Sequence, residues 1–564
     1  MLRSQAEKTL ANAIAIGSFL TTIAVVGWNA NEPVNAPKLV FLGATAFACL
    51  PLLIGSHKGI NFPRQRKFLF VTSTLFIFFA LISLFMSESS IPQGFFGIYG
   101  RNTGFLAYLC LVIIFWSTSL IQMAPNTKIV LSSIYYAGIV NIVYFILTQI
   151  GIQLINWNNP NKLVLGTFGN TNFVGAFMGI FVVICSISFF SNESKLKKKL
   201  FLGALILVAL YEVKLSHAVQ GIVVTLLGWT VAVFFYIRSK FLSRIFLMGY
   251  SVVVTLLGFV AAAGALQIGP LTKLIYKTSV SLRGEYWYAG WHMGITHPVF
   301  GVGMDSYGIW YRRMRAPSAL ILPGPDITSN AAHNVFMDLF ASGGFPLLIS
   351  YIILNFFVAF NIWRGFKVIK SFDPIFVTLV AGWICYEAQS VISINQIGIA
   401  IWGWVFGGLL IGYVQGCFQS GTKDEKSSIF VKQSKGRVST PKRKELSVLI
   451  LIAGGLLGAA IASPPYISDS KWYSSLKKMD PTRLEPNSKG WPLEPMRLLQ
   501  ASDLYTQHNV PSRGLEIALY ATREFPNSFE AWKIYFGTPG ISNAEKVRVK
   551  AELHRLDPLN PAFK

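Results

Sequence analysis

The sequence RGEYWYAGWHMGITHPVFGVGMDSYGIWYRRMR occupies residues 283–315, and AAHNVFMDLFASGG follows at residues 331–344. Together these stretches form the longest polar interruption in the hydrophobic first two-thirds of the chain. They concentrate cationic and imidazole side chains, namely Arg283, His292, His297, Arg312, Arg313, Arg315 and His333. Apolar runs lie on both sides. We therefore expect the surrounding segments to hold this region at one face of a membrane.

The composition indicates a membrane protein. The chain has 564 residues, of which 53% are hydrophobic and only 13% are charged, whereas soluble domains carry roughly 25% charged residues. Many apolar runs reach the roughly 20 residues that a helix needs to cross a bilayer. Because lipid offers no hydrogen bonds to the backbone and the runs lack barrel-type alternation, they must be helical. The sequence predicts an all-α polytopic membrane protein.

The apolar runs predict about thirteen transmembrane helices, and this odd number places the two termini on opposite sides. The predicted spans lie near residues 10–29, 38–55, 68–87, 104–122, 129–150, 173–191, 200–215, 218–236, 245–268, 334–360, 375–393, 396–417 and 447–463.

The net charge of +24 is distributed in alternation with the spans. In a soluble protein such a charge would suggest nucleic acid, but here every basic cluster follows an even-numbered span. The clusters lie at residues 58–67, 195–199, 238–244, 364–370 and 432–444. Since positive loops stay in the cytoplasm, the N-terminus is predicted to be cytoplasmic and the C-terminus extracytoplasmic. Nucleic acid is not an expected partner.

The alternation of apolar spans and basic clusters predicts that the chain has four parts. Residues 1–417 form a polytopic domain whose large outer loop, residues 269–333, carries aromatic residues spaced as in short amphipathic surface helices. Residues 418–446 form a basic cytoplasmic linker, and residues 447–463 form the last span. Small and apolar residues at helical spacing, with Pro closing each unit, predict one or two tetratricopeptide-like helical hairpins in residues 464–564. Such a tail suits the docking of a protein partner.

The arginines of the outer loop call for a functional explanation, because an outer loop needs no positive charge for its topology. Guanidinium groups bind phosphate through paired hydrogen bonds, so Arg283, Arg312 and Arg313 are candidates for an anionic ligand. Arg101, in the earlier outer motif GRNTG, has two interpretations. It reaches lipid headgroups as a snorkelling side chain, or it contacts an anion that the flanking glycines allow to approach.

Two further outer segments carry candidate polar residues. Gly166, Asn170 and Asn172 belong to the motif GTFGNTN, which opens a span. They either cap the helix or form an anion site at its N-terminus. Lys214 and His217 lie in the short link after the seventh span. They contact an anion or, in the case of Lys214, pair with a nearby glutamate.

His333 is the first candidate for chemistry. It stands at the outer end of the tenth span, followed by Asn334 and Asp338. A neutral imidazole can take a proton from an attacking hydroxyl, although a histidine at a helix start also serves as a hydrogen-bonded cap. The five cysteines show neither CxxC pairs nor metal-ligand spacing, so no metal site is expected.

In this order and topology, the motifs resemble the O-antigen ligase and O-antigen polymerase superfamily of bacterial envelope glycosyltransferases. The resemblance covers most of residues 90–417. It rests on GRNTG (100–104), GTFGNTN (166–172), R-x-x-x-W (283–287), HPVFGVG (297–303), HNVFM (333–337) and the GG pair (343–344).

The resemblance implies transfer of a glycan from an undecaprenyl-diphosphate carrier to an acceptor hydroxyl at the outer face of the bacterial cytoplasmic membrane, with no cofactor. Arg101 and Arg283 would hold the diphosphate, with help from Arg312 and Arg313, while His333 would activate the acceptor for an inverting attack. Many members carry a Ser-Arg pair after the seventh span. This sequence has LSHAVQG there, so either Lys214 or His217 would take the place of the arginine, or the contact with the carrier would differ.

Three enzymatic roles share these motifs. They are ligation of a finished glycan to a lipid core, polymerisation of repeat units, and O-glycosylation of a protein. The HPVFGVG and HN elements favour the ligase. A lipid or glycan transporter is the alternative from another class, but it would predict symmetric internal repeats. A scaffold that works through its tail is the third possibility.

Overall fold

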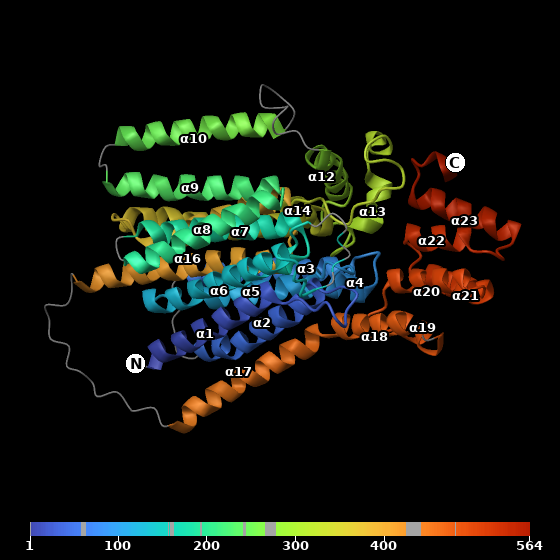
Figure 1. The fold of residues 1–564 in the computed structure, drawn as a ribbon, viewed down its shortest axis with the longest axis horizontal. Helices are drawn as coiled ribbons and strands as arrows, with labels where there is room; N and C mark the ends of the chain where they lie inside the picture. Colours follow the sequence, from blue (N-terminus) through green and yellow to red (C-terminus); the bar gives the residue numbers. More distant parts are fainter. Residues whose placement is uncertain are drawn as a thin grey trace.

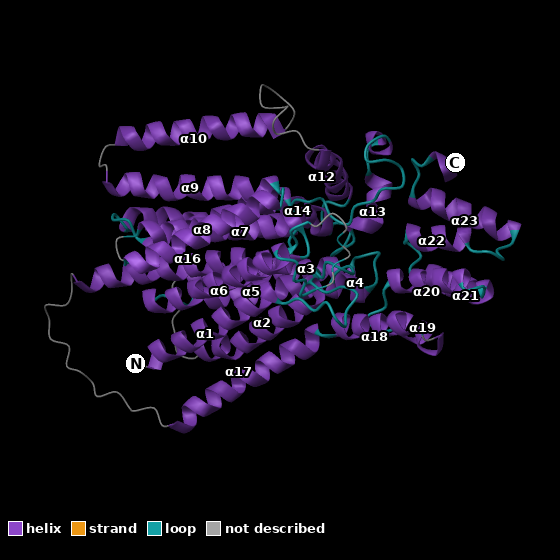
Figure 2. Ribbon diagram, in the orientation of Figure 1, coloured by secondary structure: helices purple, strands orange, loops and turns teal. Residues whose placement is uncertain are grey.

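The computed structural model describes residues 2–57, 64–155, 157, 159, 163–191, 195–240, 244–265, 278–424, 441–479 and 481–563. Within these ranges the chain consists of helices and loops (Figure 2). Each predicted span lies on a helix. These helices are α1 (Leu2–Ile23), α2 (Asn35–His57), α3 (Arg64–Phe85), α5 (Phe105–Thr118), α6 (Ala124–Gln149), α7 (Thr171–Phe190), α8 (Leu196–Leu215), α9 (Val219–Lys240), α10 (Arg244–Ala265), α14 (Val335–Val368), α15 (Pro374–Ile392), α16 (Ile397–Asp424) and α17 (Pro441–Ala462).

Eight of the described helices are long and apolar enough to cross a membrane, and the bent pair α17–α18 would be a ninth. α5 and α10 have apolar segments that are shorter. The multi-pass membrane character is thus confirmed, while the count of thirteen spans stays a prediction. α16 continues to Asp424, so it takes up the beginning of the segment predicted as a linker; residues 425–440 lie outside the described ranges.

The long helices run side by side and define two ends of the molecule (Figure 1). The N-terminus lies at one end. The other end gathers the short helices α4 (Ile91–Phe96), α12 (Thr278–Thr296) and α13 (Tyr307–Met314), together with the C-terminal tail. This separation agrees with the predicted placement of the outer loop opposite the N-terminus. Residues 266–277, at the start of that loop, lie outside the described ranges.

The bundle is packed around α7 and α16, whose apolar windows are 83% and 100% buried. α17 joins it through close backbone contact with α2. A Cβ on Gly43 would lie 2.7 Å from the carbonyl oxygen of Gly458, and a Cβ on Gly454 would lie 2.5 Å from that of Phe47. Small residues allow such approach between membrane helices. They bring the start of the tail next to α2.

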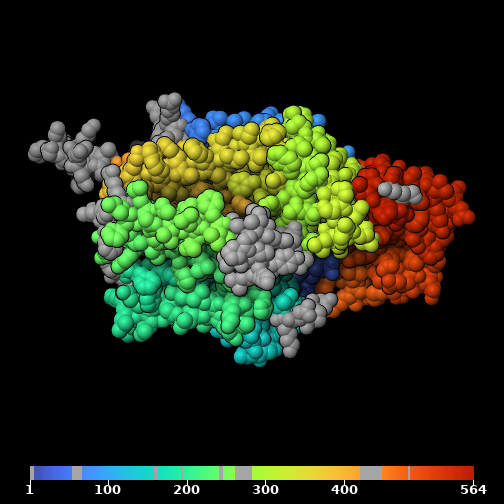
Figure 3. All heavy atoms as spheres, turned by 90° about the horizontal axis from the view of Figure 1, so that it is seen from above, coloured from blue at the N-terminus to red at the C-terminus, as the bar shows by residue number. Residues whose placement is uncertain are grey.

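The tail contains α18 (Pro464–Lys478), α19 (Pro481–Ser488), α20 (Pro495–Gln507), α21 (Pro511–Glu524), α22 (Phe529–Gly537), α23 (Asn543–Leu556) and η3 (Pro561–Phe563). Consecutive helices from α20 to α23 pack on each other, and Ser528 and Ser542 cap α22 and α23. The predicted helical hairpins are present as packed helix pairs, while their tetratricopeptide character stays a prediction. In Figure 3 the tail abuts the surface formed by α12–α14.

Candidate active site

The site is shaped by a break in α14. Gly343 (φ −133°, ψ 15°) and Gly344 (φ 64°, ψ −161°) leave the helical conformation between two helical pieces. The conformation of Gly344 is accessible almost only to glycine. The break interrupts the helical hydrogen bonds, so carbonyl groups just before it need other donors.

The motif at residues 297–303 supplies these donors. Its backbone lies against the break and exchanges hydrogen bonds with it: Val302 N to Ala341 O (2.8 Å), Gly303 N to Ser342 O (3.0 Å), and Phe345 N to Pro298 O (2.8 Å). The HPVFGVG and GG motifs therefore form one structural unit. This unit places the start of α14, which carries Asp338, beside the loop that carries Asp305.

A pocket of about 440 Å³ opens at this junction. Three segments that are distant in the sequence meet around it: the loop before α5, the region from Met304 to Asn330, and the first turns of α14. Its lining residues are Arg101, Thr103, Tyr108, Met304, Asp305, Tyr307, Asn330, Ala331, Asp338, Leu339, Ser342, Ile394 and Asn395. Two carboxylates, one arginine and several hydroxyl and amide groups thus face a common space.

Arg101 is the unsatisfied group of this pocket. Its Nη1 atom is buried and has no hydrogen-bond partner among the described residues. Burial lowers its pKa, and the nearby Asp338 and Asp305 carboxylates only partly oppose this effect. A buried guanidinium nitrogen without a partner costs free energy, so the arrangement suits an anionic ligand that supplies the missing acceptor.

Asp305 and Asp338 connect the segments of the site. Asp305 has a positive φ of 52°, and its Oδ2 accepts a hydrogen bond from the backbone N–H of Ile98, in the segment that leads to Arg101. Burial raises the pKa of Asp305 to about 6, although Ile98 and Arg101 lower it. Asp338 Oδ1 accepts a hydrogen bond from the N–H of Ala332. Asp338 therefore fixes the turn next to His333.

His333 lies beside the pocket, just before α14, in a left-handed conformation (φ 56°). Asn334 caps the helix through a hydrogen bond from Met337 N, so His333 is not the cap. Its ring stacks on Tyr286, with centroids 5.5 Å apart. Burial, together with the positive charges of Arg101 and Arg283, lowers the pKa of His333 to about 4. The imidazole is therefore neutral at pH 7.

Both Arg101 and Arg283 lie close enough to His333 for their charges to lower its pKa. Arg283 comes from α12, Arg101 from the loop before α5 and His333 from the turn before α14. Burial also lowers the pKa of Arg283. One anion placed between the two arginines would also lie near the imidazole.

Arg312 and Arg313 have other contacts. Arg312 bonds the backbone carbonyls of Pro325 and Asp326 and forms ion pairs with Glu530 and Asp557 of the tail. Arg313 pairs with Glu88 and with Asn527. Their guanidinium groups are engaged in holding the tail, and we do not include them in the proposed diphosphate site.

The other candidates lie outside the pocket lining. Asn170 caps α7 through a hydrogen bond from Asn172 N, and Asn172 O accepts one from Gln220. Gly166 has a φ of 53° and borders Asn141 and Val174. These contacts agree with the capping interpretation of GTFGNTN. Lys214 and His217 are exposed at and just beyond the C-terminal end of α8.

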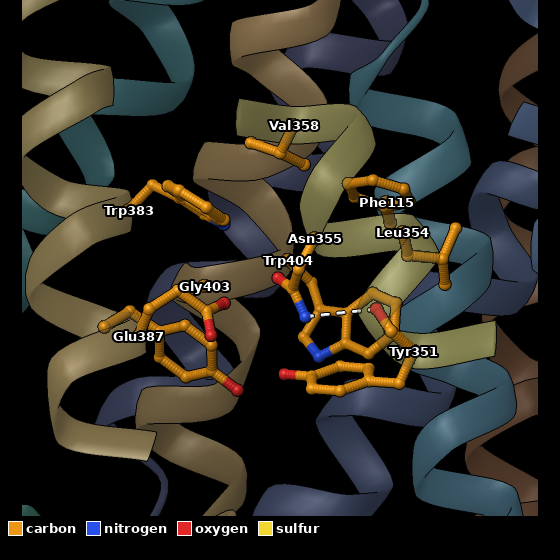
Figure 4. A pocket seen from close by; sticks show the side chains of 10 residues that line it. Phe115, Tyr351, Leu354, Asn355, Val358, Trp383, Glu387, Gly403 and Trp404 are labelled. Atoms are coloured by element: carbon orange, nitrogen blue, oxygen red, sulfur yellow. Dashed lines mark hydrogen bonds between the residues drawn. The ribbon is translucent and has the colours of Figure 1, made fainter. Parts of the chain in front are cut away.

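A second pocket, of about 260 Å³, lies deeper between α5, α14, α15 and α16 (Figure 4). Tyr351, Glu387 and Trp404 are among its lining residues. Tyr386 also lines it and donates a hydrogen bond to Asn395 Oδ1 at 3.1 Å, and Asn395 lines the first pocket. The two pockets are therefore linked through one tyrosine–asparagine contact.

Sequence reasoning did not select Asp305, Tyr307 or Asn330 as site residues, although all three line the pocket. Asp305 lies two residues after the glycine motif of residues 297–303, and that position was its only local signal. Within the described residues, no group of three or more His, Cys, Asp or Glu side chains could hold a metal ion.

Residues 204–352 match the family model described as O-antigen ligase, and this match supports the resemblance to the O-antigen ligase superfamily. The matched region runs from within α8 to within α14 and includes Arg283, His333 and Asp338. Arg101 and the tail lie outside it. The chain matches no curated protein in a sequence comparison. The superfamily groups glycosyltransferase-like ligases and polymerases that act on lipid-linked glycans in the bacterial inner membrane.

Proposed function

We propose that this protein transfers a glycan from an undecaprenyl-diphosphate carrier to an acceptor hydroxyl at the extracytoplasmic face of the bacterial inner membrane. The observation that carries the proposal is the buried Arg101 Nη1 without a partner, in a pocket that also holds Asp305 and Asp338. Arg283 and the neutral His333 lie beside it. A diphosphate group would satisfy both arginines.

In the proposed step, the acceptor oxygen attacks the anomeric carbon of the donor glycan with inversion. The new bond joins this oxygen to the anomeric carbon, and the bond from that carbon to the diphosphate oxygen breaks. The acceptor proton passes to an imidazole nitrogen of His333. The electron pair leaves with the carrier diphosphate, whose charge Arg101 and Arg283 stabilise.

The two arginines also couple donor binding to the base. In the structure, burial and the charges of both arginines lower the pKa of His333, which keeps the imidazole unprotonated but makes it a weak base. A bound diphosphate would offset these charges and raise the pKa towards that of an ordinary histidine. His333 would thus become an effective base when the donor is in place.

The test is His333→Ala in the full-length protein, assayed with its lipid-linked glycan donor. Removing a general base costs roughly 100- to 10,000-fold in rate, and the protein level in the membrane should not change. His554→Ala, at an exposed histidine of α23, is the matched control and should transfer normally. Full activity of His333→Ala would show that His333 is not the general base.

The ligase is our preferred role, and the accumulated species distinguishes it from the others. Cells that lack the protein should accumulate complete polymer on the carrier. Single repeat units on the carrier would instead indicate a polymerase, and loss of a glycoprotein with normal surface polymer would indicate protein glycosylation. A transporter would move the intact lipid-linked glycan without cleaving the glycosyl–phosphate bond, so release of free undecaprenyl diphosphate separates it from all three enzymes.

A further inference from the structure

The tail reaches the segment before His333 through one buried carboxylate. Asp557 has no exposed surface. Its two oxygens lie 2.7 and 2.8 Å from Arg315 Nη2, and Oδ2 also lies 3.3 Å from Arg312 Nη1. Removing one partner of such a buried pair leaves an uncompensated charge. Asp557 therefore governs the position of both arginines.

The same arginines hold the segment that leads to His333. Arg312 and Arg315 both donate to the carbonyl oxygen of Pro325, at 2.9 and 3.0 Å, and Arg312 donates to that of Asp326 at 3.1 Å. Asn330 and Ala331, a few residues further along, line the pocket. Hydrogen bonds thus connect the tail to residues 325 and 326, in the segment that leads to the turn beside the proposed base.

A second tail carboxylate reaches the loop of Arg101. Asp469 Oδ2 accepts hydrogen bonds from the backbone N–H groups of Asn31 and Glu32, and Tyr99 donates its hydroxyl hydrogen to Asp469 Oδ1 at 2.6 Å. Tyr99 lies two residues before Arg101. The ring of Trp491 also packs edge-on against Phe96, with centroids 5.4 Å apart.

The tail between these two carboxylates has its own packed core. Trp472 of α18 donates to Gln500 of α20 at 2.9 Å, and one buried cluster contains residues from α18 to α22. A second cluster contains residues from α21 to α23, and Ile534 packs against both clusters. Because close-packed interiors transmit displacement, this core fixes the distance between Asp469 and Asp557.

We propose that the tail is a clamp that sets the position of the Arg101 loop relative to the His333 turn, with Asp469 and Asp557 as positioning residues. The tail is then part of the active enzyme and not only a docking module. This inference rests on the proposed function for its kinetic consequence. Its structural consequence, restraint of the two loops, is independent of that function.

The structural test is hydrogen exchange of the full-length protein in lipid nanodiscs. Asp557→Asn should accelerate amide exchange in residues 324–334, and Asp469→Asn should accelerate it in residues 97–102, because each loses its own anchor. Glu516→Gln is the matched control, since Glu516 is an exposed tail carboxylate paired with Arg513 on the same helix. Unchanged exchange in both loops would overturn the clamp.

The kinetic test uses the same variants with the lipid-linked donor. Asp557→Asn should lower kcat by roughly 10- to 100-fold, because a shift of about 1 Å in a reacting group can cost ~100-fold. The affinity for undecaprenyl diphosphate, measured as inhibition, should stay near that of the wild type, since Arg101 is not displaced. Asp557→Glu, which keeps the charge, should recover part of kcat.

The outcomes separate the two proposals. Normal kcat in both Asp variants, with an inactive His333→Ala, overturns the clamp and leaves the function intact. A rise in kcat also overturns it, because the tail would then be inhibitory. If the Asp variants exchange faster in residues 97–102 and 324–334 but the wild-type protein transfers no glycan, the clamp is supported and the proposed glycan transfer is rejected. If Asp557→Asn does not fold, Glu530→Gln tests the same anchor more mildly, because Glu530 is partly exposed.

Discussion

Two groups of arginines in this protein differ in what surrounds them. Arg312 and Arg315 have carboxylate and carbonyl partners from their own chain. Arg101 is also largely enclosed, yet its Nη1 atom has no partner among the described residues. The sequence offered both Arg101 and Arg312 as candidates for a phosphate. Within the described part of the chain, Arg312 and Arg315 lack a partner only at the Nε atom, whereas Arg101 lacks one at its terminal Nη1 atom. The difference teaches that an arginine whose terminal nitrogens are paired serves the fold, whereas a buried one with an unpaired terminal nitrogen is prepared for a ligand.

The largest expected effect comes from Arg101 itself. Arg101→Ala should lower transfer by roughly 100- to 1,000-fold, the cost of losing one donor that stabilises developing charge. Thermal stability should fall only slightly, because Arg101 Nη1 makes no hydrogen bond among the described residues and Asp305 keeps its bond from the N–H of Ile98. Steady-state transfer and thermal unfolding in detergent check the two expectations. Arg101→Lys should rescue poorly, since an ammonium group cannot make the paired hydrogen bonds of a guanidinium.

A backbone change at the break in α14 should have the next largest effect. An added Cβ at Gly344 would lie 2.3 Å from the Pro298 carbonyl oxygen, at a φ of +64°. Gly344→Ala should therefore destabilise the protein by about 1–3 kcal/mol, measured as a lower unfolding temperature. Gly284→Ala in α12 is the control, because no atom lies within 4 Å of the added Cβ. Equal behaviour of the two variants would contradict the importance of the break.

The third prediction concerns pH. In the proposed mechanism only neutral His333 can act as the base. Burial, together with the charges of Arg101 and Arg283, lowers its pKa to about 4. Arg283→Gln removes one of these charges and raises the pKa, so the acidic limb of the kcat/KM profile should move to higher pH. Any part of the pH profile that reports Asp305, whose pKa is about 6, should not move in this variant. The charge that acts on Asp305 is that of Arg101, which Arg283→Gln leaves in place. Arg523→Gln, at an exposed tail arginine, should leave the whole profile unchanged.

The smallest effect is expected at an exposed ion pair of the tail interface. Lys533 Nζ lies 2.9 Å from Asp326 Oδ1, and the two side chains are 50% and 74% exposed. Such pairs contribute about 0–1 kcal/mol, so Lys533→Ala should change activity by less than roughly twofold. A large loss in this variant would show that the interface does not depend chiefly on its buried carboxylates.

The sequence predicted the helices well because lipid imposes a simple rule. A segment that crosses a bilayer must satisfy its own backbone, and long apolar runs mark such segments directly. Each predicted span accordingly lies on a helix. The break in α14 was not predicted, although its glycines were noted as a motif. Their effect depends on the backbone of residues 298–303, which comes from another part of the chain.

The candidate site was predicted only in part, because it too depends on contacts between distant parts of the chain. Arg101, Arg283 and His333 were selected from motif context, and the structure places both arginines within electrostatic reach of His333. Whether an arginine is paired could not be predicted, because the partners of Arg312 and Arg315 lie more than 200 residues away, in the tail. Asp305 was missed because its contact with Ile98 is also long-range.

The union of the two glycine motifs has a consequence for how this region tolerates substitution. The loop and the broken helix contact each other through main-chain atoms. At Gly301 and Gly303, an added Cβ would lie 2.2 Å from Ser342 C and 2.3 Å from Ser87 Cβ. In a saturation mutational scan, we expect these two positions to tolerate no residue other than glycine. The exposed Val299 should be permissive, whereas the buried Val302 between the glycines should accept only apolar residues.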